Sequence, residues 1–371
     1  MEILPYLKEM VEKNASDLFF SVGARPNIRI EGEASAIGTD PVDAEAMKRL
    51  VEPLLSEEER SRFESERELN FSYHHDGIGR FRINLFLSRG QISMAARYIK
   101  DTVPGVTELG LPEILNELVL EKRGLVLVTG TTGSGKSTTL ASMIDYRNNH
   151  TTGHILKIGD PIEFVFGHKN SVVDQREVGS DTHSHDAALM NALREAPDMI
   201  MIGEIRDAKV MNQALRFSET GHLCLSTLHA SNAHQSLERV LNFFPEAERQ
   251  RVLQDLSLHL KAIISQRLII GKGGKRVVAV EVMLNSAHIA DLIAQGRITD
   301  VREAMEKQAH DRRKGVLTFD QSILKLWRED KITAGEALRN ADSQHNVHMT
   351  IEFEKPGSLD GVVDVDLTLG E

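Results

Sequence analysis

The sequence predicts an α/β fold in which a doubly wound parallel sheet follows a smaller α+β domain. The strongest indication is a set of predominantly apolar runs at residues 124–129, 155–158, 199–202 and 223–227. Such runs are typical of parallel strands that are buried on both faces. Helical stretches separate the runs, and this alternation predicts helices on both faces of the sheet. A glycine-rich turn directly after the first run is the second indication, because ligand-binding loops follow strands at the carboxyl edge of such sheets.

The first hundred residues have the pattern of a separate α+β domain. Apolar residues recur at helical spacing at the start, at Ile3, Leu4, Leu7, Met10 and Val11. Two further helices are expected near 42–54 and 56–65, the second starting with a capping box formed by Ser56 and Glu59. Short alternating or β-rich segments predict strands at 17–21, 27–30, 69–73, 79–87 and 92–99.

The rest of the chain divides by composition. Pro104-Gly105 is a strong breaker and marks a linker. Helical patterns dominate after residue 286, at 287–295, 298–308, 317–329 and 333–340. The last 30 residues hold seven acidic residues and one lysine, so we expect a flexible tail with short strands at 349–353 and 362–367. The predicted parts are an N-terminal domain at 1–100, a linker at 101–115, a core with the parallel sheet at 116–285, a helical part at 286–341 and the tail at 342–371.

Composition excludes several classes of function. The formal net charge of −11 argues against broad electrostatic binding of nucleic acid. The single cysteine, Cys224, rules out an intrachain disulfide, which suits a reducing cytosol, and it is most simply a core residue. Since no apolar run reaches about 18 residues, we expect no direct membrane insertion.

A phosphate-binding loop is the clearest functional motif. Residues Gly130–Ser137 match G-x-x-x-x-G-K-[ST], between a predicted buried strand and a predicted helix. The glycines allow backbone N–H groups to curl around phosphate oxygens, and the helix N-terminus adds partial positive charge. Lys136 is expected on the β- and γ-phosphates of ATP, and the Ser137 hydroxyl on Mg²⁺. The predicted nucleotide-binding residues are Gly130, Thr131, Thr132, Gly133, Ser134, Gly135, Lys136, Ser137 and Thr138.

Carboxylates follow two of the other predicted strands. Glu204 comes directly after the run 199–202, and Asp160 and Glu163 follow the run 155–158. A carboxylate beside the γ-phosphate can orient water or hold Mg²⁺ through a water molecule. Glu204 is the first candidate for both tasks and Glu163 the second, the alternative for each being a helix cap.

Two histidines flank the run 223–227. His222 precedes it and His229 follows it. Their spacing does not fit a zinc site, since no Cys or His pair accompanies them. His229 is instead a candidate sensor of phosphate or of a subunit interface.

At this point several ordered motifs resemble one family. Beside the P-loop, these are Ala15-Ser-Asp-Leu, Asp160-Pro-Ile-Glu163, Gln175-Arg-Glu-Val178, the segment 194–207, and Thr220-Gly-His-Leu-Cys-Leu-Ser-Thr-Leu-His229. Asp160-Pro-Ile-Glu163 looks like that family's aspartate box, and the segment 194–207 looks like its Walker B region. The segment 220–229 looks like its histidine box. The chain is similar to the secretion ATPases, specifically to type IV pilus retraction ATPases of the PilT/PilU kind, over residues 1–340.

The resemblance implies a RecA-like P-loop ATPase domain behind a PAS-like N-terminal domain, in a ring of six identical chains. It implies that ATP binds between neighbouring chains, with residues reaching the site in trans or sensing it. The positions that match are Arg80, Arg82, Arg97, Arg194, His222 and His229. Without the resemblance, ordinary surface charge is the simpler interpretation of the three N-terminal arginines. The resemblance also implies a cytoplasmic motor that is peripheral at the inner membrane. Its load would be a membrane platform protein of the pilus machine.

Some positions depart from the family pattern. Gly159 stands where the aspartate box has a further glutamate, and Met190 where PilT-type proteins have a second arginine. The retraction motif is here Ala-His-Ile-Ala-Asp-Leu-Ile at 287–293, and the C-terminus is extended. Phe243-Phe-Pro and the segments 189–197 and 336–343 are more similar to the PilU type, which implies an accessory role beside a PilT-type partner.

Two alternatives remain open. An assembly ATPase of the same superfamily is disfavoured because its four-cysteine zinc module is impossible with one cysteine. A ring component that binds ATP but hydrolyses little, as a scaffold or adaptor for a partner motor, is consistent with the departures at Gly159 and Met190.

Overall fold

The computed structural model describes residues 2–30, 32–99, 102–159, 161–309 and 315–359. The chain divides into two compact units, Met1–Thr102 with Ile162–Val165, and Val103–Pro161 with Phe166–Glu371. Each unit has its own sheet and its own hydrophobic core. Asp160, the linker residue 101 and the expected strand at 362–367 lie outside the described residues.

The first unit is built on a six-stranded antiparallel sheet with the order β3-β2-β1-β6-β5-β4. Its strands are β1 Asp17–Ser21, β2 Asn27–Ile30, β3 Glu33–Ala36, β4 Glu68–His75, β5 Gly79–Ser88 and β6 Gln91–Ile99. Helices α1 Leu4–Glu12, α2 Ala44–Val51 and α3 Glu57–Glu66 accompany it. The expected helices and strands are confirmed, and so is the capping box at the start of α3. The short, fully exposed β3 was not expected, because it has no apolar residue larger than alanine.

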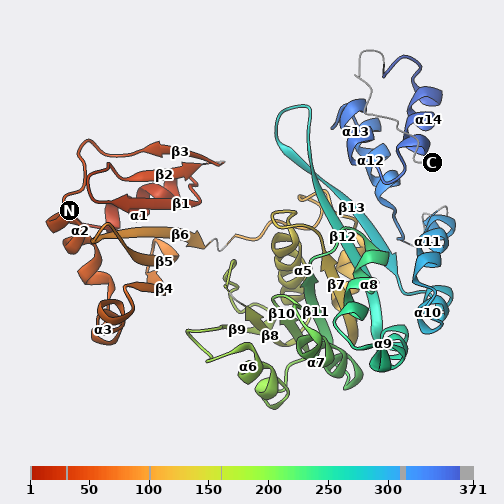
Figure 1. The fold of residues 1–371 in the computed structure, drawn as a ribbon, viewed down its shortest axis with the longest axis horizontal. Helices are drawn as coiled ribbons and strands as arrows, with labels where there is room; N and C mark the ends of the chain where they lie inside the picture. Colours follow the sequence, from red (N-terminus) through yellow and green to blue (C-terminus); the bar gives the residue numbers. More distant parts are fainter. Residues whose placement is uncertain (1, 31, 100–101, 160, 310–314, 360–371) are drawn as a thin grey trace. The chain divides into compact units, whose positions relative to one another are not determined.

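The second unit contains the predicted parallel sheet, in the order β13-β12-β7-β11-β10-β8-β9 (Figure 1). The strands are β7 Gly124–Thr129, β8 Gly153–Gly159, β9 Ser171–Glu177, β10 Met199–Ile202, β11 Leu223–Leu228, β12 Leu260–Ile270 and β13 Arg276–Leu284. All neighbours pair in parallel except β12 and β13, which form an antiparallel hairpin at one edge. The four expected strands are confirmed, whereas β9, β12 and β13 are additional.

Helices cover both faces of this sheet, as expected of a doubly wound fold. They are α4 Ile114–Leu120, α5 Lys136–His150, α6 His185–Ala192, α7 Ala208–Glu219, α8 Ala233–Asn242, α9 Glu246–His259, α10 Ala287–Ala294 and α11 Val301–Ala309. Leu125 and Leu127 of β7 join the core formed with α6 to α11. Val126 and Val128 alternate with them along the strand and therefore face the other side, where α5 packs.

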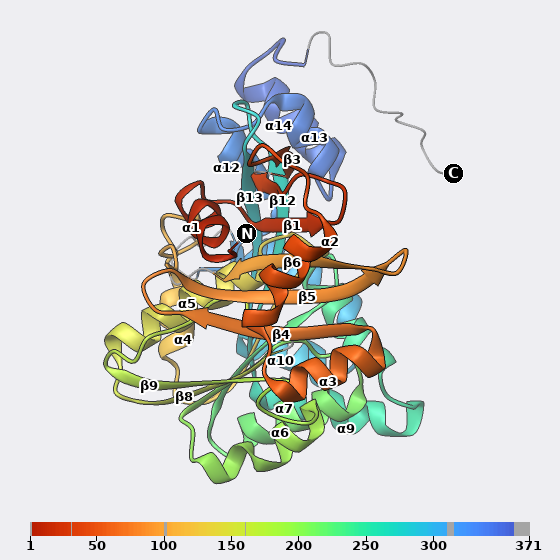
Figure 2. The same ribbon diagram turned by 90° about the vertical axis from the view of Figure 1, so that its left-hand side faces the viewer.

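The C-terminal helices form a separate cluster on the β12–β13 hairpin. They are α12 Phe319–Arg328, α13 Ala334–Asn340 and α14 Gln344–Glu354, drawn in blue in Figure 1 and again at the top of Figure 2. The expected flexible tail with a strand at 349–353 is wrong for this part of the chain, since α14 is helical. Val347 and Ile351 lie one helical turn apart and are completely buried against the cluster, and this burial stabilises a helix rather than a strand.

Candidate nucleotide-hydrolysis site

The P-loop joins a fully buried strand to a long helix. All six residues of β7 are buried, and α5 begins at Lys136 and runs for 15 residues. Gly133 and Gly135 have φ of +78° and +95°, which favour glycine. A Cβ on Gly130 would lie 2.7 Å from the backbone oxygen of Gln266 on the neighbouring strand. The loop therefore needs glycine to bring its backbone N–H groups around an anion at the helix N-terminus.

The polar side chains of the loop are arranged to receive a phosphate. The Nζ atom of Lys136 donates to the carbonyl oxygens of Gly130 and Thr131 at 2.8 Å each. The Oγ atom of Ser134 is buried without a hydrogen-bond partner among the described residues. A buried orphan hydroxyl is unfavourable unless a ligand satisfies it, so the donor set fits a polyphosphate. Ser137 and Thr138 are half-buried in the first turn of α5, where a hydroxyl can meet a metal ion bound to phosphate.

Glu204 lies at the same edge of the sheet as the P-loop. β10, which precedes Glu204, and β7, which precedes the loop, are separated by β11 alone. Adjacent strands are about 5 Å apart, so the strand ends that carry the two groups are about 10 Å apart. Thr227 of β11 fixes the backbone on both sides of Glu204, because its hydroxyl donates to the Gly203 oxygen at 2.7 Å and its carbonyl oxygen accepts from Ile205 N at 2.9 Å.

The Glu204 carboxylate is held between two other side chains. His229 Nε2 lies 2.9 Å from one oxygen, and Arg206 Nε donates to the other at 2.7 Å. His229 follows β11 and therefore lies in the strand order between the P-loop and Glu204. The Glu204 side chain is 21% exposed and that of His229 is 46% exposed, so both are accessible to water and substrate. This arrangement can orient a water molecule and accept its proton.

Two predicted site residues of the second unit, His222 and Arg194, do not lie at this edge of the sheet. The Glu163 side chain is exposed, and it belongs to the segment Ile162–Val165 that groups with the first unit. His222 lies at the amino end of β11, where its carbonyl oxygen accepts from Gly124 N at the start of β7, so it is at the opposite edge from its own P-loop. Arg194 is exposed and donates to Asn191 Oδ1 at 3.2 Å. His222 and Arg194 therefore stay predictions for an action outside the chain's own site.

The N-terminal arginines share one face of the first sheet. Arg80 and Arg82 alternate on β5, and Arg82 is directly opposite Arg97 of β6. Arg97 Nε donates to Asp17 Oδ1 at 2.9 Å, while 65% of its side chain is exposed. Arg80 Nε is buried without a hydrogen-bond partner among the described residues. The carboxylate that orients Arg97 was not foreseen, because the two residues are far apart in sequence.

The positions that depart from the family pattern differ in their surroundings. Gly159 is buried at the end of β8, and a Cβ there would lie 3.2 Å from the Pro161 carbonyl oxygen. A larger residue would thus have to shift the following turn. Met190 is 66% exposed on α6, so the missing arginine leaves a surface position and no cavity.

One buried carboxylate near the site was not singled out from the sequence. Glu281 lies in the middle of β13, is 7% exposed, and accepts a hydrogen bond from Ala233 N at 2.7 Å. Burial raises its pKa to about 7. The sequence feature that could have identified Glu281 is its position as the one acid within the apolar run Val277–Leu284. A buried strand does not ordinarily contain an acidic residue.

Comparison with known proteins agrees with this geometry. The family model for type II/IV secretion system proteins matches residues 102–331. The type IV pilus ATPase PilU of Pseudomonas aeruginosa is 44% identical over 97% of this chain and 94% of that protein. The type IV pilus retraction ATPase PilT of the same organism is 38% identical over 93% of this chain and 100% of that protein.

A solved structure extends the comparison to the fold. The crystal structure of the pilus retraction motor PilT with bound ADP matches with a TM-score of 0.87 and 40% identity, covering 94% of this chain and 99% of that one. In the described part of this chain, no helix has the length and apolar character needed to cross a membrane. The expected α/β fold and the greater similarity to the PilU type are both confirmed. The chain belongs to the type II/IV secretion system protein family, among its type IV pilus ATPases.

Proposed function

We propose that this chain is an ATP-hydrolysing motor that helps power retraction of type IV pili and thereby supports twitching motility. The observation that carries the proposal is the Glu204–His229 pair, 2.9 Å apart, at the carboxyl edge of the sheet that also bears the P-loop. PilU and PilT, which are similar to this chain over nearly its whole length, supply the biological context.

The P-loop residues bind the substrate in this proposal. Backbone N–H groups of residues 130–138 and the Lys136 ammonium hold the phosphates of ATP, and Ser134 Oγ gains the partner that it lacks. Mg²⁺, held by the Ser137 hydroxyl and through a water molecule by Glu204, would neutralise charge on the β- and γ-phosphates. The carboxylate of Glu204 orients the attacking water and accepts its proton, with Glu163 as the second candidate.

Residues from a neighbouring chain complete the site. We propose a homo-hexamer in which Arg80, Arg82 and Arg97 offset the charge on the phosphates of a neighbour's nucleotide. Their location on one sheet face, with Arg97 oriented by Asp17, supports this role. Arg194 and His222 are proposed as further residues that act between chains, and His229 as the sensor beside Glu204.

The proposed partners follow the PilU-like character of the chain. A PilT-type retraction ATPase and an inner-membrane platform protein of the pilus machine are the expected partners, at a cytoplasmic location peripheral to the membrane. The net charge of −11 gives no support for nucleic acid as a partner.

A mixing experiment tests the arrangement between chains. Lys136→Ala removes the P-loop lysine and Arg97→Ala removes a trans-acting guanidinium, so each variant alone should lose most ATP turnover. Mixed rings of the two should regain a measurable fraction, because some interfaces then combine an intact P-loop with an intact Arg97. Absence of recovery in rings proven to be mixed would contradict the action of Arg97 in trans.

A scaffold that hydrolyses little is the second candidate, and Gly159 and Met190 favour it. Turnover by the purified chain with and without a PilT-type partner separates the two functions. An independent motor hydrolyses ATP alone, whereas a scaffold binds ATP and only changes the turnover of its partner.

A further inference from the structure

The Glu281 carboxylate anchors the helix that follows His229. It accepts from Ala233 N, the first residue of α8, at 2.7 Å, in a bond that is fully buried. Asn232 caps the same helix by accepting from Gln235 N at 3.0 Å. The first turn of α8 is therefore fixed twice, once by its own cap and once by a side chain from β13.

The hydrogen bond from Ala233 to Glu281 fixes the end of the loop 229–232, which begins with His229. β11 finishes at Leu228, paired with Thr129, and the loop 229–232 spans from there to Ala233. With one end held by the sheet and the other by Glu281, the loop carries His229 to within 2.9 Å of Glu204. Arg267 adds a weaker contact, from its guanidinium to the Ser231 oxygen at 3.5 Å.

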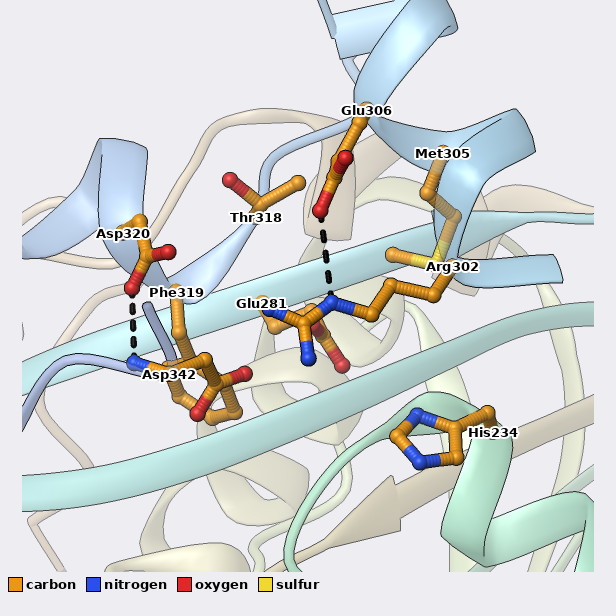
Figure 3. Close-up of a pocket in the computed structure, with 9 residues that line it drawn as sticks. All are labelled: His234, Glu281, Arg302, Met305, Glu306, Thr318, Phe319, Asp320 and Asp342. Carbon is orange, nitrogen blue, oxygen red and sulfur yellow. Dashed lines mark hydrogen bonds and ion pairs between the residues drawn. The ribbon is translucent and has the colours of Figure 1, made fainter. Parts of the chain in front are cut away.

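Figure 3 shows the charged side chains that surround Glu281. They are His234 of α8, Arg302 and Glu306 of α11, Asp320 of α12 and Asp342 after α13. Arg267 of β12, which the figure does not draw, adds a further charge. Both arginines bind other acids, Arg302 to Glu306 at 3.2 Å and Arg267 to Asp342 at 2.6 Å. No group of acids and histidines among the described residues is arranged to hold a metal ion, so the cluster is not a metal site.

The surroundings of Glu281 make ionisation of its carboxyl group unfavourable. Its pKa is raised to about 7 mainly by burial and further by Asp342, against the lowering effects of the Ala233 N–H group, Arg267 and Arg302. An ionised acceptor binds an N–H group more strongly than a neutral one does, and it favours the positive end of α8. A buried acid of this kind is a candidate for a role beyond packing.

We propose that Glu281 is a positioning residue that holds the loop 229–232 and thereby sets His229 against Glu204. This inference rests on the proposed hydrolytic role of that pair. It assigns to Glu281 no contact with ATP.

Three substitutions isolate the hydrogen bond. Glu281→Met removes the acceptor at similar length, and Glu281→Gln keeps an acceptor oxygen without the charge. Ala233→Pro removes the donor, and proline suits the first position of a helix after the extended Asn232. Glu303→Met, an exposed site on α11, is the matched control.

Two readouts are measured on the full chain. The first is kcat and KM for ATP at about pH 8, where Glu281 is largely ionised. The second is the rate at which diethyl pyrocarbonate modifies His229 without nucleotide, followed by peptide mass spectrometry relative to the exposed His74. Glu281→Met and Ala233→Pro should lower kcat by about tenfold, the loss of one charge-assisted hydrogen bond, with KM nearly unchanged. Both should change the relative modification rate of His229, and Glu281→Gln, which keeps a neutral acceptor, should restore part of both losses.

Opposite results would overturn the inference. An unchanged His229 rate in both Glu281→Met and Ala233→Pro contradicts it, as does failure of Glu281→Gln to restore any part of what Glu281→Met loses. If the wild-type chain shows no Lys136-dependent turnover, the proposed function fails, while the His229 rate still decides the role of Glu281.

Discussion

Replacing Glu281 by glutamine should stabilise the second unit by an amount that increases with pH. The pKa of Glu281 is raised from 4.5 to about 7 in the folded chain, chiefly by burial. At a pH between these two values, the carboxyl group of Glu281 is ionised in the unfolded chain but still protonated in the folded chain. The contribution of Glu281 to the free energy of unfolding therefore falls as pH rises through this window and levels off above about pH 7.

The size of this effect follows from the pKa difference. It corresponds to about 3 kcal/mol once Glu281 is ionised in both states. Glutamine does not ionise, so Glu281→Gln resembles the protonated wild type at every pH. The variant should differ little from wild type near pH 5 and exceed it by about 3 kcal/mol near pH 8.

Thermal unfolding without nucleotide, from about pH 5 to about pH 8, measures this difference. The midpoint of the variant should exceed that of wild type by about 5–10 °C at the upper end. Glu303→Gln, at an exposed site, should show no such trend. A difference that is constant with pH, or that shrinks as pH rises, would refute the reasoning about the buried carboxylate.

Four further substitutions test the site and the C-terminal helix. Gly130→Ala should abolish binding of a fluorescent ATP analogue while circular dichroism stays unchanged, because its Cβ meets a backbone oxygen of β12 at 2.7 Å. Thr227→Val removes the hydroxyl that fixes the carbonyl before Glu204, and should lower kcat by about tenfold with KM retained in steady-state assays. Ile351→Ala should destabilise the chain by about 2–5 kcal/mol in urea unfolding, because Ile351 is completely buried in α14. Phe353→Ala on the same helix should change stability by less than about 0.5 kcal/mol, because Phe353 is 89% exposed.

The parallel sheet and its loop could be predicted because local signals agreed. The runs at β7, β8, β10 and β11 are predominantly apolar, and the P-loop motif follows the first of them. Strand direction then placed Glu204 and His229 at the edge that bears the loop, without knowledge of the strand order.

The C-terminal helix α14 could not be predicted from the same signals. Its sequence is rich in polar and β-branched residues, and its two buried residues, Val347 and Ile351, are too few to show a periodic pattern. Packing on α12 and α13 decides its structure, and that packing is a property of the tertiary fold.

The contacts that orient the site residues were also beyond the sequence. Asp17 and Arg97 meet because β1 pairs with β6, and Glu281 meets Ala233 because β13 lies at the edge of the sheet beside β12. A sequence motif identifies the residues of a site. The side chains that hold these residues in place depend on the pairing of strands that are far apart in the sequence.

Mg²⁺-dependent ATP hydrolysis by the purified chain, with its oligomeric state measured by light scattering, tests the central proposal most directly. Lys136→Ala and Glu204→Gln are the controls, because one removes the phosphate-binding ammonium and the other the proposed base. The proposal predicts turnover by a hexamer that is lost in both variants. A hexamer that binds ATP without hydrolysing it, or turnover that persists in Glu204→Gln, would contradict the assignment of this chain as a motor with Glu204 at its catalytic centre.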